Sequence, residues 1–251
     1  MPSIFDQETL NFAHRGFTAR APENSLAAFR AAIELGVDGI ELDVRLCKTG
    51  EIVVLHDATV TRMTYGRGFV KARSLSELKR LRLRSDHADL DEHIPTLEEV
   101  LELVDGRVLL NIEIKTKGYP RDFIENKVAG IIKRFGVEDK TIISSFNPIV
   151  IRRVKKINDR LITGYLMDKS LRVRYSEIPL SKLTRANAIH LEKSLAKDSL
   201  LKKIRDFGFY CLVWSVNERE QMQQLLDQGV QGIITDRPDL LNELKLDNRN
   251  A

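Results

Sequence analysis

The chain is poor in the residues that build disulfide frameworks and membrane spans. Its 251 residues include 2 cysteines, 1 tryptophan and 7 prolines. Cys47 and Cys211 lie far apart in apolar stretches, without a Cys-x-x-Cys spacing, so we expect two reduced, partly buried thiols. No apolar run approaches the roughly 18 residues that cross a bilayer, and the N-terminus lacks the pattern of a signal peptide. These absences predict a cytoplasmic protein without stable membrane insertion.

Charged residues are numerous but nearly balanced. With 40 Lys and Arg against 36 Asp and Glu, the net charge is +4, which is weak support for an anionic partner. One basic stretch is most simply a solvated face, and its alternatives are a funnel for phosphate substrates or a contact with anionic lipid. We expect no nucleic acid as partner, because neither zinc-finger spacing nor an aromatic-studded basic strand is present. The stretch contains Arg67, Lys71, Arg73, Lys79, Arg80, Arg82 and Arg84.

Short β-rich apolar runs alternate with amphipathic stretches along the chain. Eight strands are expected, each followed by a plausible helix, and such βα units predict an α/β fold, a TIM (β/α)8 barrel. Thr96 and Glu99 form a capping box at one helix start, and Asn217 with Glu220 comes close to another. We expect a single barrel domain over residues 1–251. The expected strands are Leu10–Ala13, Gly39–Val44, Val108–Ile114, Thr141–Ser145, Ile162–Leu166, Ala188–Leu191, Tyr210–Ser215 and Gly232–Thr235.

One segment interrupts this alternation after the second strand. A turn at Thr49-Gly50 leads to a ninth strand, Ile52–Leu55. About forty residues then precede Thr96, where an ordinary barrel loop has about 2–6. We interpret residues 57–95 as a small insertion at the top of the second βα unit, where insertions shape the active-site mouth.

Polar side chains fall on the inner face of two expected barrel strands. Glu41 and Asp43 share a face, because residues two apart in a strand point to the same side. Neighbouring carboxylates repel each other unless a proton or cation intervenes, and oxygen ligands suit Mg²⁺ or Ca²⁺. Glu113 and Lys115 alternate in the same way, so Glu113 could complete a metal site and Lys115 could meet a phosphate. The alternatives are solvated charges at a strand end and a Glu–Lys pair that only holds itself together.

Two histidines end strands at the expected catalytic face. A histidine with a pKa of about 6.5 can take or give a proton at neutral pH, which suits His14 and His56 to acid–base work. Arg15 offers a planar fork that matches two phosphate oxygens. Trp214 is expected either to wall the substrate pocket or to lie in the core. Asn24 could orient a metal ligand or could be only a helix cap. The remaining histidines, expected to be structural, are His87, His93 and His190.

In their order and spacing, these motifs resemble the glycerophosphodiester phosphodiesterase family over nearly the whole chain. The departures are small: Ser25 stands where threonine is commoner, and Lys48-Thr49-Gly50 stands where the family tends to have an acidic residue before glycine. Neither departure touches the expected chemistry. The matching segments are His14–Gly16, Ala21–Ser25, Gly39–Val44, Val53–Asp57, Arg62–Gly68, Ile94–Glu99, Asn111–Lys115, Ser144–Phe146, Val213–Asn217 and Gly232–Pro238.

The resemblance implies a TIM barrel that binds one divalent cation, Mg²⁺ or Ca²⁺. It implies hydrolysis of glycerophosphodiesters, such as glycerophosphocholine or glycerophosphoethanolamine, to sn-glycerol 3-phosphate and an alcohol. His14 is favoured as base and His56 as acid, although the sequence leaves this open. By residue match, the implied metal ligands are Glu41, Asp43 and Glu113, the acid–base pair is His14 and His56, and the phosphate-binding residues are Arg15 and Lys115.

Several alternatives stay open at this point. The nucleophile is either water or the substrate's own glycerol 2-hydroxyl, which would give a cyclic phosphate. A lysophospholipase D would share the chemistry but would need an apolar groove. A catalytically silent phosphodiester-binding member is disfavoured by the two histidines and three carboxylates, and an enolase-type barrel would need a different base arrangement. The expected partner is a small-molecule glycerophosphodiester, and the sequence is compatible with a homo-oligomer.

Overall fold

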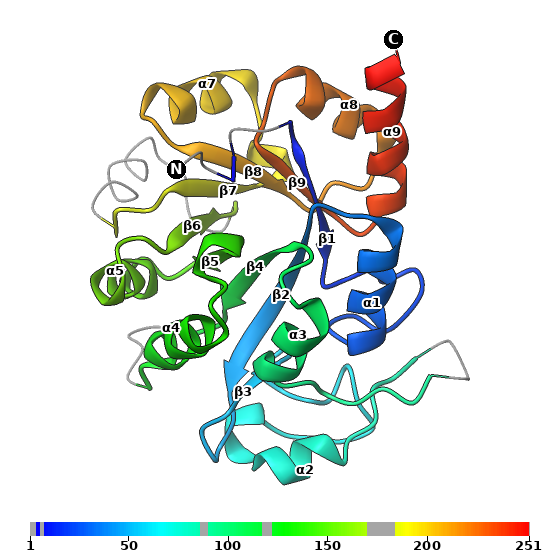
Figure 1. Ribbon diagram of the computed structural model, residues 1–251, viewed down its shortest axis with the longest axis vertical. Helices are drawn as coiled ribbons and strands as arrows, with labels where there is room; N and C mark the ends of the chain where they lie inside the picture. Colours follow the sequence, from blue (N-terminus) through cyan, green and yellow to red (C-terminus); the bar gives the residue numbers. More distant parts are fainter. Residues whose placement is uncertain (1–3, 6–7, 86–89, 117–121, 170–183, 251) are drawn as a thin grey trace.

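The computed structural model describes residues 4–5, 8–85, 90–116, 122–169 and 184–250. Within these ranges, eight parallel strands run in sequence order around a closed barrel (Figure 1). The ring closes because β1 (Leu10–His14) pairs with both β2 (Gly39–Leu46) and β9 (Gly232–Thr235). The predicted TIM barrel is confirmed, and each expected barrel strand agrees with the observed one to within two residues at either end. The other barrel strands are β4 (Leu109–Ile114), β5 (Thr141–Ser145), β6 (Ile162–Met167), β7 (Ala188–Glu192) and β8 (Tyr210–Trp214).

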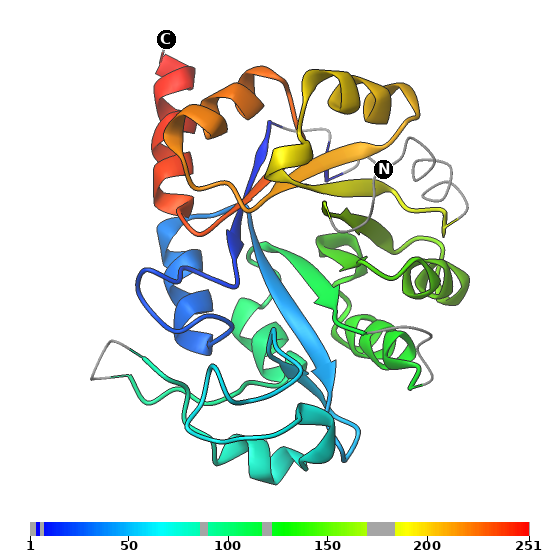
Figure 2. The same cartoon turned by 180° about the vertical axis from the view of Figure 1, so that it is seen from behind.

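Helices surround the barrel on its outside, as the two opposite views show (Figures 1 and 2). The capping box of Thr96 and Glu99 is present at the start of α3. The helix α8 instead begins after Glu218, so the interpretation of Asn217 as its cap is wrong. The helices are α1 (Leu26–Leu35), α3 (Leu97–Val104), α4 (Ile124–Phe135), α5 (Pro148–Ile157), α7 (Asp198–Asp206), α8 (Arg219–Asp227) and α9 (Pro238–Asn250), with short 3₁₀ turns η2 (Glu138–Lys140) and η3 (Lys193–Leu195).

Along the barrel strands, side chains alternate between an outer apolar layer beneath the helices and the interior of the barrel. Ile40, Leu42 and Val44 of β2 point outward and pack in the apolar layer beneath the helices. The lower barrel interior is a separate apolar cluster that includes Phe12, and a Cβ added at Gly39 would lie 2.3 Å from its ring. Glycine at that position therefore makes room for a large aromatic side chain. Toward the C-terminal strand ends the inward side chains become polar, which positions the site described below.

The segment after β2 forms a small layer at the end of the barrel. β3 (Ile52–Val54) pairs antiparallel with the end of β2, and η1 (Val70–Ala72) and α2 (Leu75–Lys79) follow it (Figure 1). The segment has its own apolar cluster, in which Leu78 and Leu83 are buried. The limits of the insertion at 57–95 and the single domain over 1–251 stay predictions. Five of the seven basic residues singled out above are exposed: Arg67, Lys71, Arg80, Arg82 and Arg84.

The remaining sequence predictions are settled only in part. Cys47 and Cys211 are free, as predicted, and they are buried more completely than the partial burial that was expected. In the described part of the chain, every helix is too short or too polar to span a bilayer. His190 is fully buried on β7, whereas His87 lies outside the described residues.

Candidate active site

Three carboxylates meet near the C-terminal ends of β2 and β4. Glu41, Asp43 and Glu113 each offer an oxygen, and these oxygens all lie within 4.8 Å of one another. The three residues are only 4%, 1% and 7% exposed. Asp43 and Glu113 are Cα partners in adjacent parallel strands, so strand register brings them together. The alternation read from the sequence therefore corresponds to one compact acidic cluster.

Two cations neutralise part of this cluster. Lys115 Nζ lies 2.8 Å from Glu113 Oε1 and 3.2 Å from Asp43 Oδ1, and Arg15 Nε lies 3.3 Å from Asp43 Oδ2. Although burial disfavours its charge, these cations hold the pKa of Asp43 below its usual range. Burial and the neighbouring Asp43 charge raise the pKa of Glu41 to about 8. One carboxyl of the cluster therefore lacks a full counter-charge.

A hard divalent cation fits this donor set. Three buried carboxylates within reach of one another supply oxygen ligands of the kind that Mg²⁺ and Ca²⁺ prefer. The two positive charges of such a cation would also relieve the repulsion that raises the pKa of Glu41. Burial likewise raises the pKa of Glu113. The sequence and the geometry thus point to the same three residues for a cation.

Asn24 holds one of these carboxylates in place. Its amide nitrogen donates to Asp43 Oδ2 at 2.9 Å, and the Asp43 backbone N–H donates to Asn24 Oδ1 at 3.2 Å. Asn24 has a positive φ of 58°, a conformation that asparagine tolerates better than most residues. The cap of α1 is the next residue, Ser25. Of its two interpretations, Asn24 therefore has the contacts of a ligand-orienting residue.

His14 is held by a carboxylate from the opposite end of the sequence. Its Nδ1 lies 2.7 Å from Asp236 Oδ1, and its Nε2 lies 3.9 Å from Glu41 Oε2. Asn217 in turn donates to Asp236 Oδ2 at 2.8 Å. Burial works against a charge on His14, but Asp236 and Glu41 outweigh it and raise the pKa of the imidazole. Asp236 belongs to a segment that carried the family resemblance, but no role in the site was predicted for it.

His56 has a carboxylate partner in its sequence neighbour. His56 Nδ1 lies 2.7 Å from Asp57 Oδ1, and Arg62 Nε donates to Asp57 Oδ2 at 2.7 Å. The hydrogen bond from Arg62 holds the pKa of Asp57 far below its usual value. Burial, together with the nearby Lys115 and Arg15 charges, lowers the pKa of His56. Both histidines thus have Nδ1 fixed by an aspartate, which leaves Nε2 for a substrate.

Arg62 also ties the segment after β3 to the barrel. Its guanidinium donates to both carboxylate oxygens of Glu23, at 2.7 and 2.9 Å. Glu23 also accepts from Arg15 Nη1 at 3.0 Å. A continuous chain of ion pairs therefore joins the two histidine-bearing strand ends. Arg62 begins a segment that carried the family resemblance, but nothing in its spacing shows that it reaches Glu23.

These groups surround a pocket of about 290 Å³ at the barrel mouth. Trp214 lines it, donating from Nε1 to the His190 carbonyl at 3.1 Å and meeting Phe146 edge to face. Of its two interpretations, Trp214 therefore has the position of a pocket wall. Asp43 lies behind the lining, bonded to Asn24. The lining residues are His14, Arg15, Glu41, His56, Asn111, Glu113, Lys115, Ser144, Phe146, Leu166, Asp168, Trp214 and Ile234.

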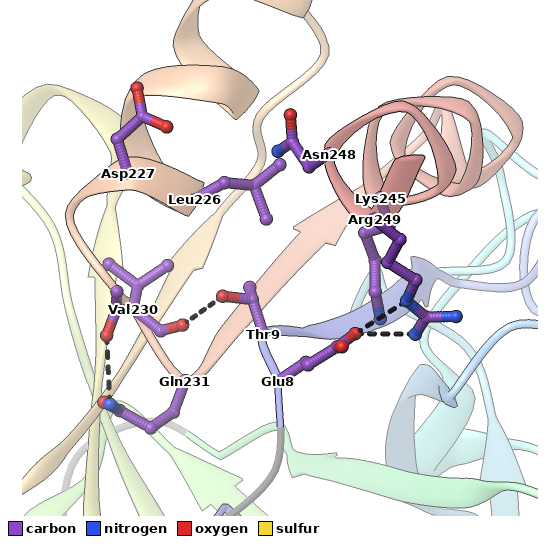
Figure 3. A pocket seen from close by; sticks show the side chains of 10 residues that line it. Glu8, Thr9, Leu226, Asp227, Val230, Gln231, Lys245, Asn248 and Arg249 are labelled. Atoms are coloured by element: carbon purple, nitrogen blue, oxygen red, sulfur yellow. Dashed lines mark hydrogen bonds and ion pairs between the residues drawn. The ribbon is translucent and has the colours of Figure 1, made fainter. Parts of the chain in front are cut away.

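A larger hollow, of about 390 Å³, lies between the start of β1 and the helices α8 and α9 (Figure 3). Several of its polar groups already bind one another. Arg249 Nη2 lies 2.6 Å from Glu8 Oε2, and Thr9 Oγ1 donates to the Val230 carbonyl at 2.7 Å (Figure 3). This hollow therefore lacks the convergent carboxylates and histidines of the smaller pocket.

Comparison with known proteins agrees with this geometry. Residues 14–240 match the model of the glycerophosphoryl diester phosphodiesterase family. A glycerophosphodiester phosphodiesterase of Caldanaerobacter subterraneus is 40% identical over 240 residues, covering 94% of this chain and 98% of the relative. The fold and the enzyme class predicted from the sequence are both confirmed.

Solved structures agree as well. The crystal structure of a glycerophosphodiester phosphodiesterase from Thermotoga maritima is 30% identical, with a TM-score of 0.80 over 95% of this chain and 99% of that one. A phosphodiesterase from Oleispira antarctica, in complex with the product sn-glycerol 3-phosphate, is 25% identical, with a TM-score of 0.83 over 96% of this chain and 98% of that one. This chain belongs to the glycerophosphoryl diester phosphodiesterase family and is an enzyme of that class.

Proposed function

We propose that the chain hydrolyses glycerophosphodiesters to sn-glycerol 3-phosphate and an alcohol. The observation that carries the proposal is a pair of histidines in one pocket, each oriented by an aspartate at 2.7 Å and lying beside a cluster of three buried carboxylates. Two general acid–base groups flanking a cation site suit the transfer of a phosphoryl group between two oxygens. The product named for the Oleispira antarctica neighbour supports the choice of glycerol phosphate.

Glu41, Asp43 and Glu113 would hold one divalent cation, Mg²⁺ or Ca²⁺. When bound, such a cation supplies Lewis-acid stabilisation of the charge that develops on phosphate oxygens. Arg15 and Lys115 line the same pocket and would bind the non-bridging oxygens. Trp214 would form an apolar wall beside the substrate.

We propose His14 as the base and His56 as the acid. His14 would take a proton from the attacking hydroxyl as the new phosphorus–oxygen bond forms, and His56 would give its proton to the leaving oxygen as the old bond breaks. The charge of Glu41 helps to keep the pKa of His14 raised, so positive charge held there would leave that imidazole neutral and able to accept. An anionic phosphate between Arg15 and Lys115 would offset the cations that lower the pKa of His56.

The attacking hydroxyl is either water or the glycerol 2-hydroxyl of the substrate. The second route would pass through a cyclic phosphate that water then opens. A diester whose glycerol lacks the 2-hydroxyl separates the two, because full turnover of it would exclude the cyclic route.

The function is tested by incubating the purified chain with glycerophosphocholine and with glycerophosphoethanolamine, in Mg²⁺ and in Ca²⁺. The proposal expects stoichiometric sn-glycerol 3-phosphate and free alcohol, detected by a coupled dehydrogenase assay. Release of a phosphorylated head group and free glycerol would contradict it, because the wrong phosphorus–oxygen bond would have broken.

A lysophospholipase D activity is a second candidate. A hollow of about 300 Å³ adjoins Lys115 and is lined partly by apolar residues, including Leu46, Phe69, Val70 and Ile124. Phe69 is 54% exposed there, so an acyl chain would find an apolar contact beside the site. Turnover of lysophosphatidylcholine exceeding that of glycerophosphocholine would favour this candidate over the first.

The remaining proposals concern the surroundings of the enzyme. We propose a small-molecule substrate as the partner, a cytoplasmic location without stable membrane insertion, and no nucleic acid bound. Cell fractionation tests the location, and light scattering tests whether the chain forms a homo-oligomer.

A further inference from the structure

The floor of the active-site pocket is polar, although the barrel interior next to it is apolar. Asn111 and Ser144 line the pocket and are 1% and 0% exposed. Within the described chain, Asn111 Oδ1 and Ser144 Oγ have no hydrogen-bond partner. Two residues before Ser144, the inward Ile142 belongs to the apolar cluster that also contains Phe12 and Leu212. Burying an unpartnered polar group costs free energy that burying an apolar side chain would not cost. These two oxygens are therefore expected to form hydrogen bonds with a bound ligand.

A third buried polar group stands beside this floor. A Cβ added at Gly164 would lie 2.3 Å from His190 Nε2, so the His190 ring fills the space over that glycine. Gly164 is the Cα partner of Ser144 on the adjacent strand. Both ring nitrogens of His190 also lack a partner among the described residues, and burial lowers the pKa of the ring to about 3. The imidazole is therefore neutral at neutral pH and can both donate and accept.

The carboxylates stand beside these two floor residues. Asn111 is the Cα partner of Glu41 on the adjacent strand, and Ser144 is the Cα partner of Glu113. A phosphate and a cation held by the charged groups would leave these uncharged oxygens to the rest of a small substrate.

We propose that Asn111 and Ser144 form a subsite for the hydroxyl groups of the glycerol moiety. This inference rests on the proposed function, which supplies a glycerol-bearing diester. A hydroxyl group both donates and accepts, so it matches a serine hydroxyl and either end of an amide. A site built to bind a substrate hydroxyl discriminates against analogues that lack it.

The test compares two ligands of similar length and the same charged group. sn-Glycerol 3-phosphate carries two hydroxyl groups, and n-propyl phosphate carries none. Binding is followed by the fluorescence of Trp214, the one tryptophan of the sequence, which lines the same pocket. Each ligand is titrated in Mg²⁺ against the wild type, Ser144→Ala and Ser145→Ala. Ser145 is the matched control, because it is equally buried but donates to the Ile114 carbonyl.

In Ser144→Ala the Kd for sn-glycerol 3-phosphate should rise about 2- to 12-fold, the effect of one lost hydrogen bond. The Kd for n-propyl phosphate should stay at its wild-type value, and Ser145→Ala should leave the preference between the ligands unchanged. A wild-type preference for the glycerol ligand that survives in both Ser144→Ala and Asn111→Leu would overturn the subsite.

The two proposals fail in different ways. If the wild type releases no sn-glycerol 3-phosphate from any glycerophosphodiester, the proposed function fails. If it does so, but the Ser144→Ala and Asn111→Leu variants keep the wild-type ligand preference, only the floor subsite fails.

Discussion

His14 Nδ1 lies 2.7 Å from Asp236 Oδ1, although 222 positions separate the two residues in the sequence. His14 ends β1 and Asp236 follows β9, and these two strands pair where the barrel closes. The aspartate therefore fixes which ring nitrogen of His14 carries a proton and leaves Nε2 toward Glu41 and the pocket. Closure of the barrel is thus itself part of building the candidate base.

Replacing this aspartate should impair catalysis more than folding. Asp236→Asn keeps the size of the side chain but can present a donor to Nδ1 and favour the wrong tautomer. We expect turnover of glycerophosphocholine to fall by about 10²-fold or more. Asp239→Asn is the matched control, since Asp239 pairs with Arg237 outside the pocket lining. Wild-type turnover by Asp236→Asn would show that the contact does not orient the base.

The two histidine roles can be separated by the leaving group. His14→Ala and His56→Ala should each lower turnover of glycerophosphocholine by about 10²- to 10⁴-fold. A p-nitrophenyl diester of glycerol phosphate has a leaving group that needs no proton, so it should restore most of the rate to the variant without the acid. We expect recovery in His56→Ala and none in His14→Ala. Recovery in His14→Ala alone would exchange the two roles.

Cation binding should strengthen as the pH rises. The pKa of Glu41 is raised to about 8, so below that pH a cation must displace a proton from this carboxyl before binding. Calorimetric titration with Mg²⁺ or Ca²⁺ should give an association constant that increases between about pH 6 and 8, by up to about tenfold per pH unit. Glu41→Gln removes the titrating group, so its weaker binding should depend much less on pH. An equal pH dependence in both proteins would rule out Glu41 as the linked group.

His190 should make the fold less stable in acid. Burial lowers the pKa of its ring to about 3, whereas an unfolded histidine titrates at about 6.5. Between these values the unfolded chain binds a proton that the folded chain does not, so this group makes the free energy of unfolding fall as the pH falls. Between these pKa values, His190 alone lowers the free energy of unfolding by about 1.4 kcal/mol for each unit that the pH falls.

The variant His190→Leu lacks the titrating ring, so it should lack this contribution to the pH dependence of the free energy of unfolding. Urea unfolding of both proteins at pH 7, 6 and 5, in EDTA, gives the difference in slope, from which contributions common to both chains cancel. If the free energy of unfolding changed equally with pH in both proteins, the buried ring would have to be protonated in the folded state.

Much of the site follows from strand periodicity. Alternation alone put Glu41, Asp43 and Glu113 on inner faces, because it fixes which side chains point into a barrel. The two aspartates that orient the histidines differ in how far the sequence could reveal them. Asp57 adjoins His56 in the sequence, whereas Asp236 meets His14 only through closure of the barrel.

Local sequence patterns led to a wrong prediction where a polar residue could either cap a helix or bind another side chain. Asn217 and Glu220 have nearly the spacing of a capping box, but the Asn217 amide binds Asp236 instead. Arg62 lies in a segment without regular periodicity, so nothing in the sequence indicated its contact with Glu23. The polar floor at Asn111 and Ser144 became visible only when burial and unmet hydrogen-bonding capacity were known atom by atom.

The central claim is that a cation-loaded carboxylate cluster and two histidines together cleave a glycerophosphodiester. It is tested most directly by the rate of sn-glycerol 3-phosphate release from glycerophosphocholine after EDTA treatment and then titration with Mg²⁺ or Ca²⁺. We predict that EDTA abolishes release in the wild type, that the cation restores it, and that Glu113→Gln and His14→Ala stay inactive at saturating cation. Full activity in EDTA, or wild-type rates from either variant, would contradict the account.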